Sequence, residues 1–419
     1  MRRNYQGGKV VTDFKEISSE DIQKAAQRLA GKLHLTPLEH SQTFSRLSGC
    51  EIWLKCENLQ RTGSFKIRGA LNRMFHLTEE EKRRGVIAAS AGNHAQGVAL
   101  GASLIGVAST VVMPTGAPMA KVEATRDYGA YVVLSGNNYD EAYQKAQSLR
   151  EQSGAAFIHA FDDPKVIAGQ GTIGIEIIRQ FPEMDKLAGI VVPVGGGGLI
   201  GGLAMAVKSL YPKVRIVGVQ AESAPAMAQS LEHHSHRIVA CRSTIADGIA
   251  VACPGDLTFR LVNDFVDQIV TIDDETIAKT MVMLLERSKL VVEGSGAIGL
   301  SALIEGKVGQ RGERWVALLS GGNIDVSAIA QIIEHGLVES GRRWEFRTIL
   351  PDKPGSLQNL LSEVALGGAN IISVIHDRLR PGLSLSQAEV SVALETRDAE
   401  HIQTIRRQLE AKGFRIIDV

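Results

Sequence analysis

The sequence predicts an α/β protein built on a buried parallel sheet, followed by a smaller ferredoxin-like unit. Short apolar runs without polar alternation recur between residues 51 and 319 and alternate with helical patterns. Such runs are typical of strands that are covered on both faces. Loops of glycine and other small residues follow three of these runs, at the place where open α/β sheets bind ligands. Residues 344–419 follow the order strand, helix, strand, strand, helix, strand, which indicates a βαββαβ unit.

The elements of the large sheet can be placed in chain order. Residues 1–17 are expected to form a flexible extension, and residues 18–21 begin a helix with Ile22, Ala25 and Leu29 on one face. Strands are expected at 51–55, 85–89, 109–113, 130–134, 156–160, 188–194, 214–219 and 315–319. Helices are expected from about 94, through 121–124, at 139–150, up to about 181, and between the strands at 188–194 and 214–219.

The chain is expected to contain two domains and a linker. The first spans residues 18–335, with a small lobe inserted at about 51–160, and a polar linker covers 336–343. The second domain spans 344–419, with pieces at 345–350, 355–366, 370–378, 387–394, 400–411 and 414–419. Because it carries no nucleophile in a suggestive setting, we expect a binding or assembly module.

Composition excludes several classes of protein. The 419 residues contain 46 basic and 46 acidic side chains, so neither nucleic acid nor a membrane surface is an expected partner. No run approaches the roughly 20 apolar residues of a membrane span. The four cysteines lack metal-binding spacing and are interpreted as reduced thiols. We therefore expect a cytoplasmic protein.

Lys66 is the first candidate for chemistry. It lies in a short loop with Gly63 and Ser64, just before a helical pattern that contains Ile67 and Leu71. A lysine drawn into a pocket is partly deprotonated and becomes a nucleophile toward carbonyl groups. A lysine at a helix start is more often simply solvated, so this hypothesis depends on other parts of the chain.

Two further loops have the composition of anion sites. Residues 90–94, Ser-Ala-Gly-Asn-His, lie between a strand and a helix, where backbone N–H groups attract a carboxylate. An ordinary serine cap with a glycine turn is the alternative for this loop. Residues 195–198 are four glycines after an apolar strand, which is typical of a phosphate cradle.

A nicotinamide enzyme is a competing hypothesis for the glycine run. Gly196, Gly198 and Gly201 satisfy G-x-G-x-x-G, and Glu222 follows the next strand as a ribose-binding acid would. The loop Ser320-Gly321-Gly322-Asn323 favours a different cofactor, because a serine hydroxyl at a strand end can face a pyridine nitrogen. Together with the lysine and the anion sites, this hydroxyl suits pyridoxal phosphate.

These motifs carry a family resemblance. Residues 64–70, 90–97, 195–198 and 320–323 resemble those of the threonine dehydratases (threonine ammonia-lyases). The resemblance covers about residues 18–335 and implies the two-lobed, tryptophan-synthase-β-like fold (fold type II) of pyridoxal-phosphate enzymes. Residues 352–357, 368–371 and 376–378 resemble an ACT regulatory domain, of which one copy is present.

The resemblance also implies roles for individual residues. Lys66 is expected to hold pyridoxal 5'-phosphate as a Schiff base and to exchange the α-proton of the substrate. The other expected cofactor contacts are Phe65, Asn93, Gly195, Gly196, Gly197, Gly198, Leu199 and Ser320. The residues expected around the substrate carboxylate are Ser90, Ala91, Gly92, Asn93 and His94.

Three acidic residues give weaker signals. Glu222 and Asp247 are candidates for a divalent cation site, as in serine racemases, but the second acid expected shortly after Glu222 is missing, so no metal is expected. Glu293 lies where the family has a glutamate near the cofactor ring, and a role as a helix N-terminal acid is equally good.

The expected activity is conversion of L-threonine to 2-oxobutanoate and ammonia, regulated by an amino acid bound to the ACT-like domain. The alternatives on the same scaffold are a serine/threonine dehydratase, a serine racemase or a hydroxyaspartate ammonia-lyase. A non-catalytic amino-acid sensor is a further alternative. A homo-oligomer, most simply a tetramer, is expected by resemblance, whereas a role in isoleucine synthesis or threonine breakdown stays open.

Overall fold

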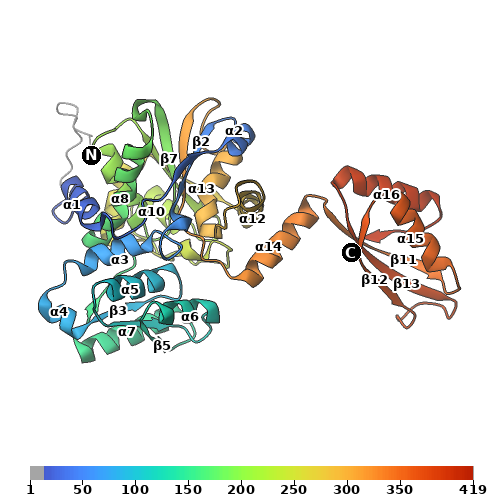
Figure 1. Ribbon diagram of the computed structural model, residues 1–419, viewed down its shortest axis with the longest axis horizontal. Helices are drawn as coiled ribbons and strands as arrows, with labels where there is room; N and C mark the ends of the chain where they lie inside the picture. Colours follow the sequence, from blue (N-terminus) through green and yellow to red (C-terminus); the bar gives the residue numbers. More distant parts are fainter. Residues whose placement is uncertain (1–13, 419) are drawn as a thin grey trace. The chain divides into compact units, whose positions relative to one another are not determined.

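The computed structural model describes residues 14–418, and the chain divides into two compact units (Figure 1). The first unit ends at Asp325 and the second begins at Val326. Each unit has its own hydrophobic core and is described by itself.

The first unit contains two sheets. Its strands are β1 (Leu38–His40), β2 (Glu51–Cys56), β3 (Val86–Ala89), β4 (Ser109–Met113), β5 (Tyr131–Leu134), β6 (Ala156–Phe157), β7 (Leu187–Pro193), β8 (Arg215–Ala221), β9 (Gln268–Ile272) and β10 (Arg314–Leu319). The larger sheet has the order β1-β2-β10-β7-β8-β9, with only β1 antiparallel to its neighbour. The smaller sheet, β5-β4-β3-β6, is entirely parallel.

Helices cover both sheets (Figure 1). They are α1 (Ser19–Leu29), α2 (Gln42–Ser48), α3 (Lys66–Met74), α4 (Glu79–Arg84), α5 (Asn93–Leu104), α6 (Met119–Asp127), α7 (Tyr139–Ser153), α8 (Pro164–Gln180), α9 (Gly198–Lys208), α10 (Ala226–Glu232), α11 (Asp256–Phe265), α12 (Asp274–Met283) and α13 (Gly294–Ile304). Short helical turns are η1 (Glu57–Leu59), η2 (Met184–Lys186), η3 (Asp247–Ile249) and η4 (Leu284–Ser288). Because helices lie on both faces, strands such as β7 and β10 are buried along almost their whole length. The predicted α/β class with a buried parallel sheet is confirmed.

The small lobe begins later than predicted. The strand expected at 51–55 and assigned to the small lobe from sequence is β2, which pairs with β10 in the larger sheet, with Ile52 opposite Trp315. The smaller sheet takes only strands between Val86 and Phe157. An apolar run does not specify its partner strand, and β2 and β10 are more than 250 residues apart in the chain.

Two other predicted boundaries differ from the structure. The strand expected at 156–160 ends at Phe157, because the following residues form a loop held by side chains. The extension expected at 1–17 lies mostly outside the described residues. However, the ring of Phe14 packs on that of Phe265, with 6.0 Å between the ring centroids, and Ile17 is buried. Its last residues are therefore part of the core.

The second unit is an antiparallel sheet with two helices packed on it. Its elements are α14 (Val326–Glu339), β11 (Arg343–Pro351), α15 (Ser356–Leu366), β12 (Asn370–Asp377), β13 (Gln387–Glu395), α16 (Ala399–Ala411) and β14 (Ile417–Asp418). The sheet order is β12-β13-β11-β14, as expected for a ferredoxin-like βαββαβ unit. Phe346, Leu360, Val392 and Ile405 join the strands and helices in one core.

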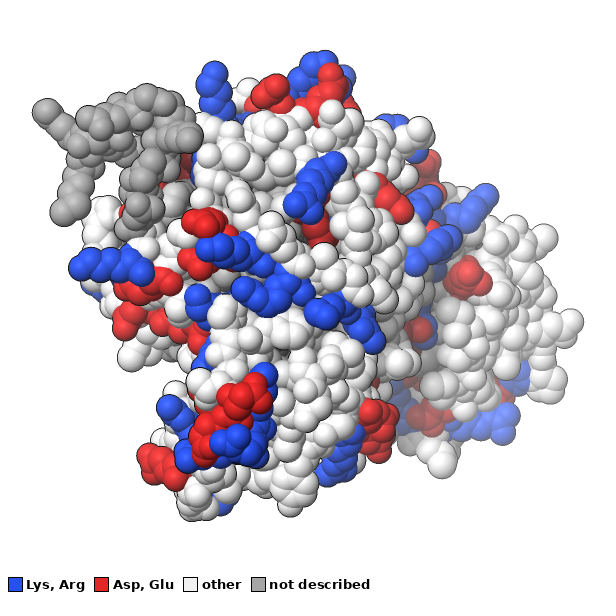
Figure 2. All heavy atoms as spheres, turned by 60° about the vertical axis from the view of Figure 1, so that its left-hand side comes forward, with Lys and Arg blue, Asp and Glu red and all other residues white. Residues whose placement is uncertain are grey.

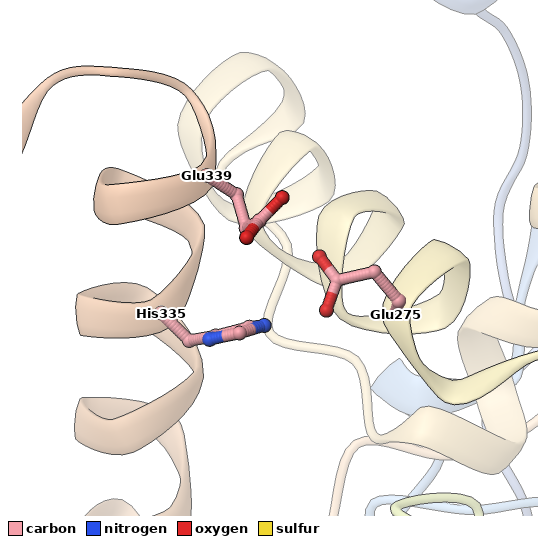
Figure 3. A group of neighbouring side chains, drawn as sticks. All are labelled: Glu275, His335 and Glu339. Carbon is pink, nitrogen blue, oxygen red and sulfur yellow. The ribbon is translucent and has the colours of Figure 1, made fainter.

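The first half of the linker expected at 336–343 is helical, and its last residue begins β11. Helix α14 continues to Glu339, and His335 and Glu339 project from one of its faces, four residues apart (Figure 3). Of the polar residues at 339–343 that suggested a linker, Glu339 ends the helix and only residues 340–342 form the turn into β11. The structural boundary falls before Val326, ten residues earlier than expected.

The surface carries charges of both signs. On the face shown in Figure 2, basic and acidic side chains are interspersed, in keeping with equal numbers of the two. Among the described residues, no helix is both long enough and apolar enough to cross a membrane.

A buried ionic network joins four elements of the first unit, β2, η1, α3 and α8. The guanidinium of Arg68 on α3 forms two hydrogen bonds of 2.7 Å with Glu57 and bonds of 2.6 and 3.0 Å with Glu176 on α8. Lys55 on β2 donates to Glu176 at 2.6 Å. Arg68, Glu57 and Lys55 are 2% exposed or less, so each charge depends on its partners.

Replacing Arg68 therefore tests the contribution of this network to folding. We expect Arg68→Ala to lower the free energy of unfolding of the first unit by about 3–5 kcal/mol, because it leaves buried carboxylates unpaired. Denaturant unfolding followed by tryptophan fluorescence measures this change. Arg83→Ala, which removes an exposed partner of Glu80, is the control and should change stability by less than about 0.5 kcal/mol. Equal effects of the two substitutions would contradict the prediction.

Candidate active site

The loop that precedes α3 is pinned to the loop that follows β10. Phe65 N donates to Ser320 O at 3.1 Å, Gly322 N donates to Gly63 O at 2.8 Å, and Ser64 forms an antiparallel bridge with Gly321. Because β2 and β10 are parallel neighbours, both loops leave the same edge of the sheet. This pairing places the first residue of α3, Lys66, at the carboxyl ends of the strands.

Lys66 faces a cavity from within the protein. Its Nζ donates to Ala160 O at 3.3 Å and lies 5.3 Å from the centroid of the Phe65 ring. Its side chain is surrounded by protein and remains partly accessible only because the cavity opens beside it. Burial lowers the pKa of Lys66 to about 8, although the negative charge of Glu293 opposes this shift. An amine with this pKa has a substantial neutral, nucleophilic fraction near neutral pH.

The cavity has a volume of about 1010 Å³ and brings the predicted site residues together. Those that line it are Phe65, Lys66, Ser90, Ala91, Gly92, Asn93, His94, Gly195, Gly196, Gly197, Gly198, Leu199 and Ser320. They come from four loops that are distant in sequence, as the sheet topology requires. Their individual roles stay predictions.

The glycine run forms a cradle that has no room for a side chain at Gly196, Gly197 or Gly198. A β-carbon on Gly196 would lie 2.5 Å from the Phe161 ring, and one on Gly198 would lie 2.7 Å from Phe161 O. Gly197 has φ +94°, a conformation that favours glycine. Within residues 14–418, the N–H groups of 195–199 have no hydrogen-bond acceptor, and they surround the start of α9. Five adjacent donors at a helix N-terminus form an anion site.

The 90–94 loop forms a second set of free donors. The Ser90 hydroxyl accepts from Gly92 N at 3.3 Å, which turns the chain into α5. The backbone N–H groups of Asn93 and His94, in the first turn of α5, have no acceptor in the described part of the chain. A carboxylate can therefore be bound here by backbone donors.

Asn93 belongs to a hydrogen-bond network beside Lys66. Its Nδ2 donates to Glu293 Oε1 at 2.7 Å, and its Oδ1 accepts from Asn323 Nδ2 at 2.8 Å. The second hydrogen on Nδ2 remains available to a ligand in the cavity. Burial and the charge of Asp247 raise the pKa of Glu293 to about 7, opposed by the hydrogen bond from Asn93.

The imidazole of His94 does not provide a charged donor. Its Nε2 donates to Ile158 O at 2.9 Å, and the ring is 3% exposed. Burial and the nearby charge of Lys66 lower the pKa of His94 to about 3, so the ring is neutral. Any contact of His94 with a substrate carboxylate is therefore made by its backbone N–H.

The two candidate cation ligands lie in different settings. Glu222 does not line the cavity and pairs with Lys307 at 3.5 Å. Asp247 does line it, at 61% side-chain exposure, and pairs with Lys121 at 3.1 Å. Since Glu222 is outside the cavity, it cannot act as the ribose-binding acid of a nicotinamide site there.

Several residues of the cavity wall were missed from sequence, among them His159 and Phe161. His159 lies after β6 in the stretch 156–160 that was interpreted as strand, and Phe161 directly follows that stretch. The polar residues around Asp162 and the following Pro164 were a local signal that the strand had ended.

The family follows from comparison with known proteins. Residues 30–321 match the family described as "Pyridoxal-phosphate dependent enzyme". The chain therefore belongs to the pyridoxal-phosphate dependent enzymes, with the fold type II architecture predicted from its motifs. The predicted cofactor, pyridoxal phosphate, is confirmed with the family.

Particular relatives narrow the comparison. An L-threonine ammonia-lyase of Thermotoga maritima is 49% identical over 400 residues, covering 96% of this chain and 99% of the relative. The processed form of threonine deaminase isoform 2 from Solanum lycopersicum is similar in structure, with TM-score 0.70, 36% identity, and coverage of 80% of this chain and 98% of that one. Maize serine racemase has TM-score 0.72, 36% identity, and coverage of 77% and 99%. The predicted resemblance to threonine ammonia-lyases is confirmed.

The cavity fits the cofactor of the family. The unbonded N–H groups of residues 195–199 suit its phosphate, and the partly neutral amine of Lys66 suits its aldehyde. The free hydrogen of Asn93 Nδ2 suits its ring hydroxyl, and the Ser320 hydroxyl, 3.3 Å from Ser295 O, remains within the same wall.

The lowered pKa of Lys66 predicts the pH dependence of cofactor capture. The rate at which apoprotein takes up pyridoxal phosphate covalently should rise with pH, reach half its maximum near pH 8 and then level off, because half of the amine is neutral at its pKa. Glu293→Gln removes a charge that raises this pKa and should move the curve to lower pH. Stopped-flow absorbance measures the rate, and Glu222→Gln, outside the cavity, is the control. A curve that rises toward pH 10.5 would contradict the prediction.

Proposed function

We propose that this protein is a pyridoxal-phosphate-dependent L-threonine ammonia-lyase that forms 2-oxobutanoate and ammonia. The observation that carries the proposal is the meeting, in one cavity, of a desolvated lysine amine with two sets of unbonded backbone donors. Curated relatives that are covered over nearly their whole length bear the name L-threonine ammonia-lyase.

The two donor sets hold the two anionic ends of the ligands. The N–H groups of Gly195, Gly196, Gly197, Gly198 and Leu199 bind the cofactor phosphate. Those of Asn93 and His94, with Ser90, Ala91 and Gly92 shaping the loop, bind the carboxylate of the amino acid. Neither set adds a formal positive charge beside Lys66, which would lower the pKa of its amine further; burial is the cause of the lowered pKa.

Lys66 is the proton-transfer group. In the loaded enzyme Lys66 would hold the cofactor, and its Nζ would accept the proton from the α-carbon of the bound amino acid. Its pKa of about 8 lies close to the operating pH, which is the condition for efficient general base catalysis. Phe65, whose ring lies beside Nζ, limits water on that side of the amine.

The remaining residues orient the ring. Asn93, held by Glu293 and Asn323, would donate its second Nδ2 hydrogen to the ring hydroxyl, and Ser320 Oγ would pair with the ring nitrogen. The bound cofactor supplies the electron sink for the charge that develops at the α-carbon. A neutral hydroxyl partner does not enforce protonation of the ring nitrogen, which moderates this sink and suits β-elimination over transamination.

The products identify the reaction. Incubation with L-threonine should give 2-oxobutanoate and ammonia, and Lys66→Ala should lose roughly 10²–10⁴-fold or more of this rate together with covalent cofactor binding. Lys165→Ala, on a partly exposed lysine outside the cavity wall, is the control and should retain both. Lactate dehydrogenase coupling measures the oxoacid, and chiral chromatography follows serine.

Other outcomes of the same assay favour the alternatives. Formation of a D-amino acid from L-serine, without oxoacid from threonine, would identify a serine racemase. This alternative is considered because the fold of this chain is similar to that of maize serine racemase. Turnover of hydroxyaspartate or of serine alone would identify the corresponding lyase. Cofactor-free protein without turnover would leave an amino-acid sensor.

The second unit is proposed to pair between copies of the chain and to bind an amino-acid effector. In the described part of the chain, β12 pairs only with β13 and forms one edge of the sheet. Ile372 and Ile375 on this edge strand are 47% and 61% exposed. A second copy of β12 would satisfy the open backbone groups and cover these side chains. We propose a tetramer, in which the paired units carry the regulation.

A substitution on β12 tests the assembly. Ile375→Glu should halve the mass measured by light scattering, because charge on the edge strand opposes strand pairing. Leu366→Glu, on the exposed end of α15, is the control and should keep the mass. Ile375→Glu should also lose any response of threonine turnover to isoleucine or valine. An unchanged mass would contradict the proposed pairing.

The proposed location is the cytoplasm. Cys50, Cys56, Cys241 and Cys253 are free thiols, and burial raises the pKa of each. Such unreactive thiols suit a reducing compartment.

A further inference from the structure

The segment from Ile158 to Asp162 contacts the main parts of the cavity wall. Ile158 O accepts from His94 Nε2 and Ala160 O accepts from Lys66 Nζ. The carboxylate of Asp162 accepts the first N–H groups of α11 at 3.1 Å. The position of this segment therefore affects the lysine and the 90–94 loop together.

Phe161, in the same segment, borders the proposed phosphate cradle formed by residues 195–198. The Phe161 ring packs on Gly196, and the backbone of Phe161 packs on Gly198. The short turn that carries Phe161 therefore borders the five unbonded N–H groups.

The imidazole of His159 stabilises this turn, and the hydrogen bonds that it accepts fix its own protonation state. Its Nδ1 accepts from Phe161 N at 3.2 Å and from Asp162 N at 2.9 Å. Since Nδ1 uses its lone pair on two donors, the single ring proton is on Nε2. Burial lowers the pKa of His159, which keeps the ring neutral, and its edge contacts with Phe157 and Phe161 fix its plane.

The Nε2–H of His159 is left for the contents of the cavity. The ring is half-buried and lines the cavity, and Nε2 has no hydrogen-bond acceptor among residues 14–418. It is a neutral donor of fixed direction next to the cradle. Both ligands of the proposed function are anions, and a hydrogen bond to an anionic oxygen is stronger than one between neutral groups.

We propose that His159 donates a hydrogen bond from Nε2 to an anionic oxygen of the bound ligand. The acceptor is the phosphate of the cofactor or the carboxylate of the amino acid. The proposal rests on the proposed function for the identity of these anions. It makes His159 a binding residue in addition to its role in the turn.

Two substitutions separate the two nitrogens of the ring. In His159→Asn, the amide oxygen takes the place of Nδ1 and preserves the turn, whereas the Nε2 donor is lost. In His159→Gln, the amide nitrogen reaches the place of Nε2 and preserves the donor, whereas the acceptor for the turn is lost. The thermal midpoint of each apoprotein reports the turn independently of any ligand.

The expected result is a selective loss of ligand affinity in His159→Asn. Its Kd for pyridoxal phosphate, or its KM for L-threonine, should rise roughly 10- to 100-fold, as for loss of one hydrogen bond to a charged group. His159→Gln should stay within about threefold of the wild type. A raised Kd alone identifies the phosphate as acceptor, and a raised KM alone identifies the carboxylate. Wild-type affinities in His159→Asn, or equal losses in both variants that follow their thermal midpoints, would overturn the proposal.

A second measurement, by NMR, is made on the wild-type protein. In wild-type apoprotein labelled with ¹⁵N-histidine, the imidazole N–H resonance that is absent from His159→Gln should move downfield on titration with inorganic phosphate or acetate. A resonance that moves with neither anion would overturn the proposal. Failure of the proposed function is distinct, because wild-type protein would then bind pyridoxal phosphate without forming 2-oxobutanoate.

Discussion

The pairing of the lysine loop with the loop after β10 is the constraint on which the site depends. Ser64 and Gly321 form a bridge, and the backbones of Gly63 and Phe65 bond to the same loop. The register of β2 against β10 therefore determines where α3 begins and where the amine of Lys66 lies. Asn323 extends this link to Thr62 at 2.6 Å and to Asn93. The loop that carries Lys66 and the side chain of Asn93 are therefore held by one set of hydrogen bonds.

Desolvation sets the chemistry of the site. Burial lowers the pKa of Lys66 to about 8 and raises the pKa of Glu293 to about 7. The pKa values of this amine and this carboxyl group, which ordinarily lie far apart, are therefore close to each other. The two sets of unbonded donors in the cavity wall are backbone N–H groups, which carry no formal charge. Donors of this kind suit an anion without adding positive charge that would lower the pKa of Lys66 further.

A buried ionic network and a hydrogen-bonded turn hold the helix that begins with Lys66 from two sides. Arg68, two residues after Lys66, is held by Glu57 and Glu176, so the first turn of α3 cannot rotate without breaking a buried network. On the opposite side, residues 158–162 bond to His94, Lys66 and the start of α11. The helix with the lysine is thus held between a charged anchor and a polar turn.

Local sequence patterns were enough for the fold class, the βαββαβ order of the second unit and the four loops that meet in the cavity, because apolar runs and glycine clusters signal buried strands and close backbone approach directly. They did not identify the sheet that β2 joins, the helix over 326–339 or the turn that contains His159. Pairing between Ile52 and Trp315, and side-chain bonds such as that from His159 Nδ1 to Asp162 N, arise only when distant or irregular segments pack. Strand pairing across more than 250 residues and the desolvation of Lys66 are properties of the packed interior, so only the tertiary structure decided them.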